Sequence, residues 1–158
     1  MSQLVKDLER ELSAMARNLR EPVTLADGTV VRRTTASLLY FLGEHEPARM
    51  GDIAAALNVD PSTTTRQVQH AIRAGLLARE GGHHDRRVVM LSLTSAGRDL
   101  YETLIQRQRQ GLLHILDGWP DQDQEDLVRL ISLFNGEIDA LRAATLSARR
   151  SDRPDAPE

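Results

Sequence analysis

The sequence predicts a mostly helical fold of the α+β class, in which two short helices and a β-hairpin are flanked by longer helices. Apolar residues recur every three or four positions near both ends of the chain, which indicates amphipathic helices. Residues 60–75 carry the capping residues of one short helix. Between residues 76 and 93 the pattern changes to that of two strands around a glycine-containing turn.

The first expected element is an amphipathic helix over residues 4–19. Its apolar side chains, spaced three or four positions apart, are Leu4, Leu8, Leu12, Met15 and Leu19. Glu21-Pro22 ends this helix, because the residue before a proline is disfavoured in the α conformation. Residues 24–33 contain the turn signal Asp27-Gly28 and are expected to form a connector with a short extended piece.

Three shorter helices are expected in the middle of the chain. The first covers residues 35–43 and stops at the break in residues 44–47, and the second covers residues 50–57. The third runs over residues 61–74 with Asp60 as its N-cap, because the carboxylate can accept bonds from free backbone N–H groups. Pro61 suits the first helical position, and Gly75 suits the left-handed residue after the helix.

Two strands and two long helices complete the expected elements. Residues 76–80 and 88–93 read as strands around a turn at 81–85, and one face of the second strand is apolar. That face comprises Val89, Leu91 and Leu93.

The first long helix is capped by Thr94 and runs to about residue 116, with Leu100, Leu104 and Ile105 facing inward. After a break at Trp119-Pro120, the second is expected over residues 123–146. The polar segment 147–158 is expected to be disordered.

Composition and charge narrow the possible functions. The chain has 158 residues and no cysteine, which excludes disulfides, cysteine zinc sites and thiol redox sensing. With no long apolar run and no signal sequence, a cytoplasmic protein without membrane contact is expected. The net charge is −3, yet residues 61–98 hold six arginines against two acids, a local charge of +4. A basic segment on an acidic protein is typical of a nucleic-acid contact.

The two short helices joined by residues 58–60 form a helix-turn-helix, whose second helix places its first residues against base edges in the major groove. Threonines are poor helix formers, so three in succession favour a functional role, and Arg and Gln match guanine and adenine edges. The predicted contacts with double-stranded DNA are Ser62, Thr63, Thr64, Thr65, Arg66 and Gln67, with Gln69, His70 and Arg73 further along the helix.

The turn between the two strands carries Asp85, Arg86 and Arg87. A hairpin with arginines at its tip is suited to the minor groove, whose negative potential attracts guanidinium groups. Asp85 can orient one of them by a bidentate pair. The hairpin is therefore expected to act as a wing, which makes residues 34–97 a winged helix-turn-helix domain.

Residues 85–97 resemble the wing signature of MarR-type regulators, Asp-x-Arg followed by a strand and Leu-Thr-x-x-Gly. Residues 75–79 resemble the family's Gly-Leu-Leu-x-Arg after the recognition helix. The resemblance implies that Arg87 is the minor-groove arginine and Asp85 its partner. It also implies a two-fold dimer on a pseudo-palindromic site, with a small aromatic or anionic effector bound between head and dimer helices.

The flanking helices have more apolar surface than one winged helix can cover, so residues 1–33 and 98–146 are expected to form the region that pairs two chains into a homodimer. The resulting hypothesis is a sequence-specific transcriptional regulator that acts as a repressor. Its alternative is a winged-helix module for protein–protein contact without a DNA function.

Other sites receive little support. The sequence contains no phosphate loop, nucleophile elbow or paired catalytic carboxylates, so no enzyme activity and no cofactor are expected. A zinc site built from His83, His84 or His45 with Glu44 and Glu46 is conceivable, but no His-x₃-His pair supports it. Effector contacts are left open, since the apolar residues at the expected junction are more typical of core. They are Met15, Leu19, Leu38 and Tyr40.

Overall fold

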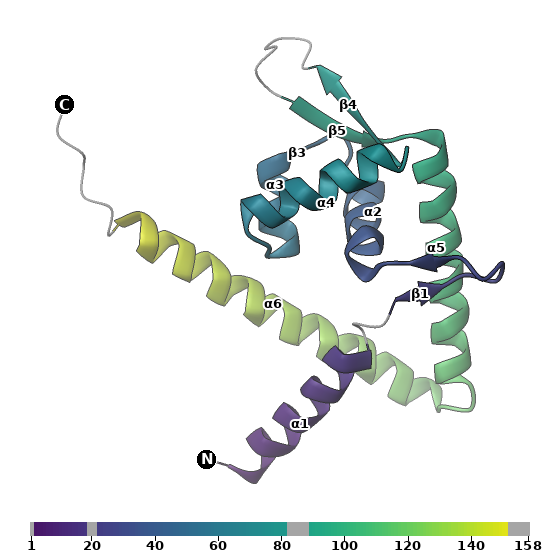
Figure 1. The fold of residues 1–158 in the computed structure, drawn as a ribbon. Helices are drawn as coiled ribbons and strands as arrows, with labels where there is room; N and C mark the ends of the chain where they lie inside the picture. Colours follow the sequence, from purple (N-terminus) through teal and green to yellow (C-terminus); the bar gives the residue numbers. More distant parts are fainter. Residues whose placement is uncertain (1, 19–21, 82–88, 152–158) are drawn as a thin grey trace. The chain divides into compact units, whose positions relative to one another are not determined.

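The computed structural model describes residues 2–18, 22–81 and 89–151. The chain is predominantly helical with two small antiparallel sheets, as the sequence predicted (Figure 1). The helices are α1 (Gln3–Asn18), α2 (Arg33–His45), α3 (Met50–Leu57), α4 (Pro61–Arg73), α5 (Ser95–Leu116) and α6 (Asp121–Ser151). The strands are β1 (Val23–Thr24), β2 (Val30–Val31), β3 (Ala48–Arg49), β4 (Leu77–Gly81) and β5 (Val89–Leu93). Two compact units divide the chain, Met1–Gly111 and Leu112–Glu158.

The larger sheet has the strand order β3–β5–β4, with both pairs antiparallel. β4 and β5 form the predicted hairpin, in register from Leu77 opposite Leu93 to Gly81 opposite Val89. β3 was not predicted. It consists of two residues that pair with Leu91 and Met90 of β5, which is too short a run to leave a periodic pattern.

The segment expected to be a connector is a second hairpin, β1–β2, in which Val23 lies opposite Val31. Gly28 has a φ of 84°, a conformation that glycine adopts without a steric cost. Asp27 accepts a hydrogen bond from the backbone N–H of Thr29 at 2.9 Å, and this bond lowers the pKa of the Asp27 carboxyl. The turn signal was therefore correct, and the extended piece is a paired strand.

One hydrophobic core lies between α2, α3, α4, the larger sheet and the first half of α5. Its fully buried members come from each of these elements, and the largest are Leu38, Leu39, Leu42, Ile53, Val68, Leu91 and Leu104. Val89, Leu91 and Leu93 were expected to share one apolar face of β5. Leu91 and Leu93 are buried, but Val89 is exposed because it pairs at the far end of the hairpin, beyond the core.

Side chains from distant parts of the sequence hold β5 and α5 against the end of α2. The Glu46 carboxylate accepts a hydrogen bond from the backbone N–H of Leu93 at 2.7 Å, and its second oxygen pairs with the Arg98 guanidinium. Thr94 caps α5 as predicted, accepting from the Gly97 N–H at 3.0 Å. A Cβ on Gly97 would collide with the carbonyl oxygen of Leu76, so this position requires glycine.

Several predicted boundaries change. α2 extends beyond residues 35–43 at both ends, and α6 begins at Asp121. α6 also continues to Ser151, so the prediction of a disordered tail from residue 147 was wrong for residues 147–151. Ala148 and Arg149 in this segment are good helix formers. Residues 152–158 lie outside the described part of the chain. Among the described helices, none has the length and hydropathy needed to cross a membrane.

Candidate nucleic-acid interface

The turn between α3 and α4 is fixed by backbone hydrogen bonds. Asn58 adopts the left-handed conformation with φ 50°, and its N–H donates to the Ala55 carbonyl at 3.2 Å. The N–H of Val59 donates to the Ala54 carbonyl at 3.1 Å, so the last carbonyls of α3 are satisfied. Asn tolerates this conformation better than most residues, and the chain reverses sharply into α4. The two helices therefore form the predicted helix-turn-helix.

Asp60 caps α4 as predicted, and Pro61 is the first helical residue. The Asp60 carboxylate accepts hydrogen bonds from the Ser62 hydroxyl at 2.6 Å and from the Thr63 N–H at 2.9 Å. These bonds, that from Ser62 first, hold the pKa of Asp60 well below its usual range. Because the Ser62 hydroxyl donates its proton to Asp60, its oxygen can act only as a hydrogen-bond acceptor for a ligand in this conformation.

The C-terminal end of α4 also follows the prediction. Gly75 has a φ of 72°, and its N–H donates to the Ile72 carbonyl at 2.9 Å. The Leu76 N–H donates to the Ala71 carbonyl at 3.0 Å, which completes the paired bonds of a glycine-terminated helix. Both ends of α4 are thus defined by local hydrogen bonds.

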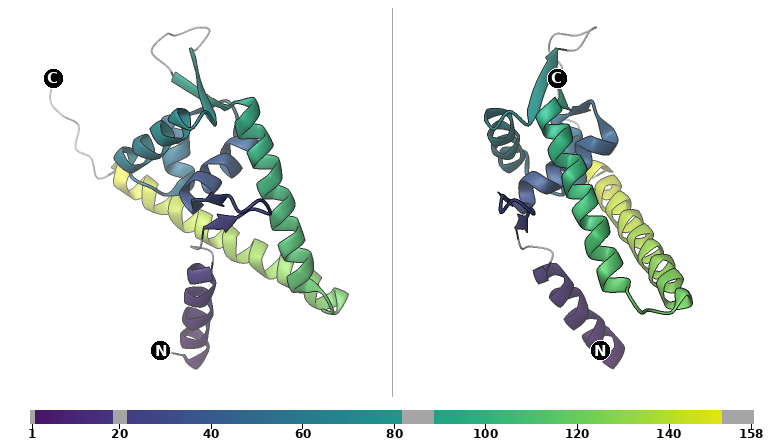
Figure 2. Two further views of the ribbon diagram at one scale, coloured as in Figure 1. Left: turned by 45° about the vertical axis from the view of Figure 1, so that its right-hand side comes forward. Right: turned by 90° about the vertical axis from the view of Figure 1, so that its right-hand side faces the viewer.

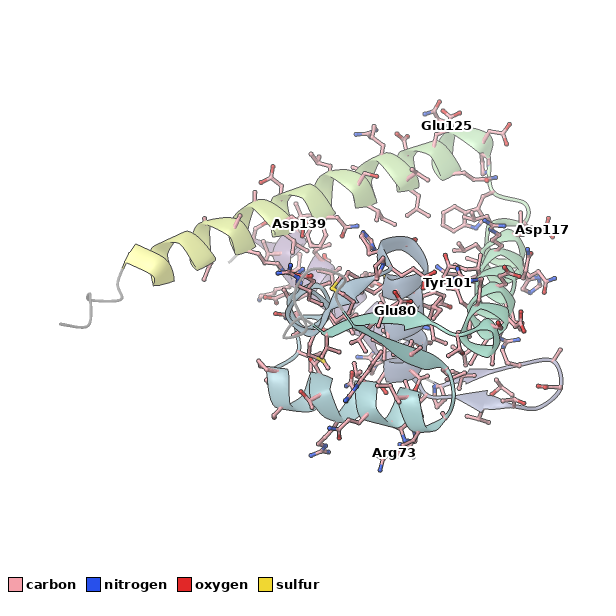
Figure 3. The ribbon with its side chains drawn as sticks, turned by 90° about the horizontal axis from the view of Figure 1, so that it is seen from above. Arg73, Glu80, Tyr101, Asp117, Glu125 and Asp139 are labelled. Atoms are coloured by element: carbon pink, nitrogen blue, oxygen red, sulfur yellow. The ribbon has the colours of Figure 1, made fainter. Side chains whose placement is uncertain are left out.

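The two faces of α4 differ in chemistry. Thr64, Val68 and Ala71 are buried against the rest of the core. The exposed side chains recur at spacings of three and four and form one stripe, which we call the α4 stripe: Ser62, Arg66, Gln69, His70 and Arg73. The Arg73 side chain points outward from α4 (Figure 3). The stripe is polar and cationic, and it runs along the helix that corresponds to the recognition helix of a helix-turn-helix.

The predicted DNA contact at Thr64 is wrong. Thr64 is only 1% exposed, and its hydroxyl donates to the Asp60 carbonyl at 3.0 Å. Thr65 is half-buried and donates to the Pro61 carbonyl at 2.7 Å, while Thr63 is half-buried above the cap. The threonine run is therefore partly structural, because its hydroxyls satisfy carbonyls in the first turn of α4.

Gln67 is half-buried and lies on the side of α4 that faces α2. It borders a pocket of about 320 Å³ together with Arg33, Thr34 and Ser37 of α2. Leu57 and Val59 complete the lining. Gln67 therefore lies at the edge of the α4 stripe and not in its centre.

The wing is described only in its strands. Asp85, Arg86 and Arg87, predicted to enter the minor groove, lie outside the described residues, as do His83 and His84. The base of the hairpin is held by the Ser92 hydroxyl, which donates to the Glu80 carboxylate at 2.5 Å. Arg98, counted in the basic segment, is paired with Glu46 and is not directed at a ligand.

Metal ligands do not gather in the described ranges. Among residues 2–18, 22–81 and 89–151, no group of three or more His, Asp or Glu side chains could hold a metal ion. His45 stacks on Phe41, with ring centroids 4.8 Å apart, and its Nδ1 lies 3.1 Å from the Phe41 carbonyl oxygen.

Comparisons with known proteins agree with this geometry. A MarR family model matches residues 31–88, which span the helix-turn-helix and the start of the wing. The HTH-type transcriptional repressor MdtR of Bacillus subtilis (strain 168) is 30% identical over 105 residues, covering 65% of this chain and 67% of MdtR. The HTH-type transcriptional regulator YwhA of the same organism is 27% identical over 108 residues, covering 66% and 75%.

A solved structure has the same fold. A MarR family protein from Bacillus stearothermophilus superposes with a TM-score of 0.71 at 24% identity, covering 88% of this chain and 99% of that one. Members of this family are DNA-binding regulators of transcription, not enzymes, and they typically act as dimers. A capped recognition helix, a hairpin at the position of a wing and these matches lead to one conclusion: the chain belongs to the MarR family of transcriptional regulators.

Proposed function

We propose that this regulator is a homodimeric repressor that binds a pseudo-palindromic operator through its α4 stripe and is released by a small-molecule effector. The observation that carries the proposal is the stripe itself. Its five exposed polar side chains lie on one face of a helix whose other face is buried in the core. A helix held in this way presents its polar face to a major groove without losing its own packing.

The proposed contacts divide by their place on the head. Arg66 and Gln69 lie in the middle of the stripe and are assigned to base edges, because their side chains form bidentate hydrogen bonds with guanine and adenine. His70 and Arg73 are assigned to bases or backbone further along. The edge of the major-groove contact is assigned to Ser62, Thr63, Thr65 and Gln67. The minor-groove contact remains proposed for Asp85, Arg86 and Arg87.

Exposed apolar residues support the homodimer. Residues 1–33 and 98–146 are proposed as the dimerisation region around a head at residues 34–97. Leu4, Leu8 and Met15 of α1 are exposed, as is Leu113 near the end of α5, at 72%. In α6 no described side chain is buried, and its exposed large apolar residues are Leu127, Val128, Leu130, Ile131, Leu133, Phe134 and Leu141. Helices of this kind gain stability when a second chain covers them.

Two observations bear on repression and release. MdtR is named a transcriptional repressor, and we extend that role to this chain. A groove of about 670 Å³ lies between the β1–β2 turn and α5, bordered by Leu25, Tyr101, Ile105 and Arg109 among others. Tyr101 supplies an aromatic ring, and Arg107 and Arg109 supply cations beside the acids Asp99 and Glu102. The groove is therefore the proposed site for a small aromatic acid. Leu38, considered at first for this role, is fully buried core.

Effector binding would act by shifting the population of dimers between two head spacings, only one of which fits successive major grooves. The alternative of a protein–protein module is set aside, because the family consists of DNA-binding regulators.

The proposal is tested by footprinting the full chain on the DNA upstream of its own coding sequence, with and without benzoate. We expect a symmetric protected site that weakens when benzoate is added. A neutral analogue, benzyl alcohol, serves as the control for the carboxylate. Protection that ignores sequence at physiological salt would remove the operator-specific function, whereas protection indifferent to any aromatic acid would remove only the effector.

A further inference from the structure

A pocket beside α4 contains an arginine that the α4 stripe does not include. The pocket has a volume of about 320 Å³ and lies between the first turns of α2, the α3–α4 turn and α4. Arg33, Thr34 and Ser37 line it from α2, and Gln67 lines it from α4. Four of the lining residues therefore carry groups that can donate hydrogen bonds, and they stand beside the apolar Leu57 and Val59.

Arg33 has no carboxylate partner among the described residues, although it is half-buried. Arg98, by contrast, is exposed and pairs with Glu46. The charge of Arg33 reaches Tyr40, two turns along α2. Burial raises the pKa of Tyr40, and Arg33 opposes that rise. A half-buried cation among neutral hydrogen-bond donors favours an anion as ligand.

The position of the pocket points to a particular anion. The β4–β5 hairpin lies on one side of α4, and the first turn of α2 lies on the other, in all the ribbon views (Figures 1 and 2). A helix in the major groove has a phosphate backbone on each of its two sides. The wing is placed to meet DNA on one side of α4, so the pocket is placed to meet it on the other. Gln67 links the two, because it borders the pocket and follows Arg66 of the α4 stripe.

We infer that Arg33, with Thr34, Ser37 and Gln67, binds a DNA backbone phosphate on the side of α4 opposite the wing. This inference rests on the proposed DNA-binding function and adds a contact outside the helix-turn-helix and the wing. A phosphate contact carries no sequence information, so Arg33 sets the affinity and the seating of α4 but not the base preference. Each chain of a dimer contributes one such contact.

The test compares Arg33→Ala, Arg33→Lys and Arg153→Ala in the full chain. Arg153 lies beyond both the head and the proposed dimerisation region, so its replacement matches the change in net charge without altering either. Affinity for an operator duplex and for an unrelated duplex is measured by fluorescence anisotropy at several salt concentrations. Circular dichroism melts confirm that each variant is folded.

We expect Arg33→Ala to weaken binding to both duplexes by a similar factor, about tenfold, and to lower the salt slope by about one for each half-site. Arg33→Lys should keep most of the slope, and Arg153→Ala should behave as the unaltered chain. If the unaltered chain binds operator and Arg33→Ala has the same affinity and slope, the inference is wrong while the proposed function stands. If the unaltered chain binds neither duplex, the proposed function has failed.

A second measurement separates DNA phosphate from a free anion. Binding of inorganic phosphate and of benzoate to the protein without DNA is followed by NMR chemical shifts. Loss of benzoate binding in Arg33→Ala, with DNA affinity unchanged, would make the pocket a small-anion site and overturn the inference. Loss of DNA affinity alone supports it.

Discussion

α4 exposes one polar face, whereas α6 is exposed around its whole circumference and carries large apolar residues. The exposed face of α4 carries Arg66, Gln69 and Arg73, and its other face is buried in the core of its own chain. α6 exposes Ile131, Phe134 and other large apolar residues, and none of its described side chains is buried. α4 is therefore complete as a packed helix and lacks only a polyanion. α6 lacks a protein surface to pack against, which a second copy of the chain would supply.

The largest expected effect comes from disrupting the apolar face of α6. Ile131→Asp places a charge where we propose a dimer interface, whereas Ser132→Asp places the same charge on the next residue, away from that face. Ile131→Asp should convert the dimer into a monomer of 17.6 kDa and lower operator affinity about a thousandfold, toward the non-specific level. Sedimentation velocity and anisotropy measure both quantities. A stable Ile131→Asp dimer would place the interface elsewhere.

A core substitution in the head should lower stability by an amount that does not depend on protein concentration, unlike a substitution at the proposed dimer interface. Leu39 is fully buried, so Leu39→Ala should lower the free energy of unfolding by about 2–5 kcal/mol through lost burial and a cavity. Phe134→Ala in α6 is the comparison. Chemical denaturation at several protein concentrations should show a Leu39→Ala deficit that is independent of concentration and a Phe134→Ala deficit that grows on dilution. The same concentration dependence for both would erase the distinction between the two regions.

Within α4, substitutions on the exposed face should change base preference, and substitutions on the buried face should change stability. Arg66→Ala should cost about 1–3 kcal/mol of discrimination at one base pair of each half-site. Thr64→Ser removes only a buried methyl group, so it should lower stability and leave the base preference unchanged. Selection from a random duplex library reads the preference of each variant. An altered preference in Thr64→Ser would mean that the inward face also takes part in recognition.

The smallest effect concerns the cap of α4. Because hydrogen bonds from Ser62 and Thr63 lower the pKa of Asp60 in the folded chain, its stabilisation is complete above the unfolded pKa of about 3.9. It is lost as the pH falls toward the lower folded value. Asp60→Ala should lower the melting temperature by about a few degrees at neutral pH. Asp60→Asn, which still caps, should remove the contribution of this residue to the decline between pH 4 and pH 2.

Local chemistry made part of this molecule predictable. Asp60, Pro61 and Gly75 marked both ends of α4, since capping depends on residues within a few positions of the helix end. The helix over residues 50–57 was predicted with its correct bounds from the spacing of its apolar residues. These signals locate the helix-turn-helix without any tertiary information.

Contacts between distant residues were not predictable in this way. Glu46 bonds to Leu93 and Arg98, which lie 47 and 52 positions further along the sequence, and no local pattern indicates either partner. Thr64 is a different case. It lies four positions before Val68 and seven before Ala71, which places it on the buried face of α4. The helical period therefore predicted its burial, although the run of three threonines had suggested a DNA contact.

The central claim is that two α4 stripes, held by a dimer, read two half-sites. Hydroxyl-radical footprinting of the full chain on a duplex selected from a random library tests it most directly. We predict two protected half-sites related by a dyad, with centres about 10–10.5 base pairs, or a multiple of one helical turn, apart. A single unsymmetrical protected patch, bound by one chain per duplex, would contradict the claim.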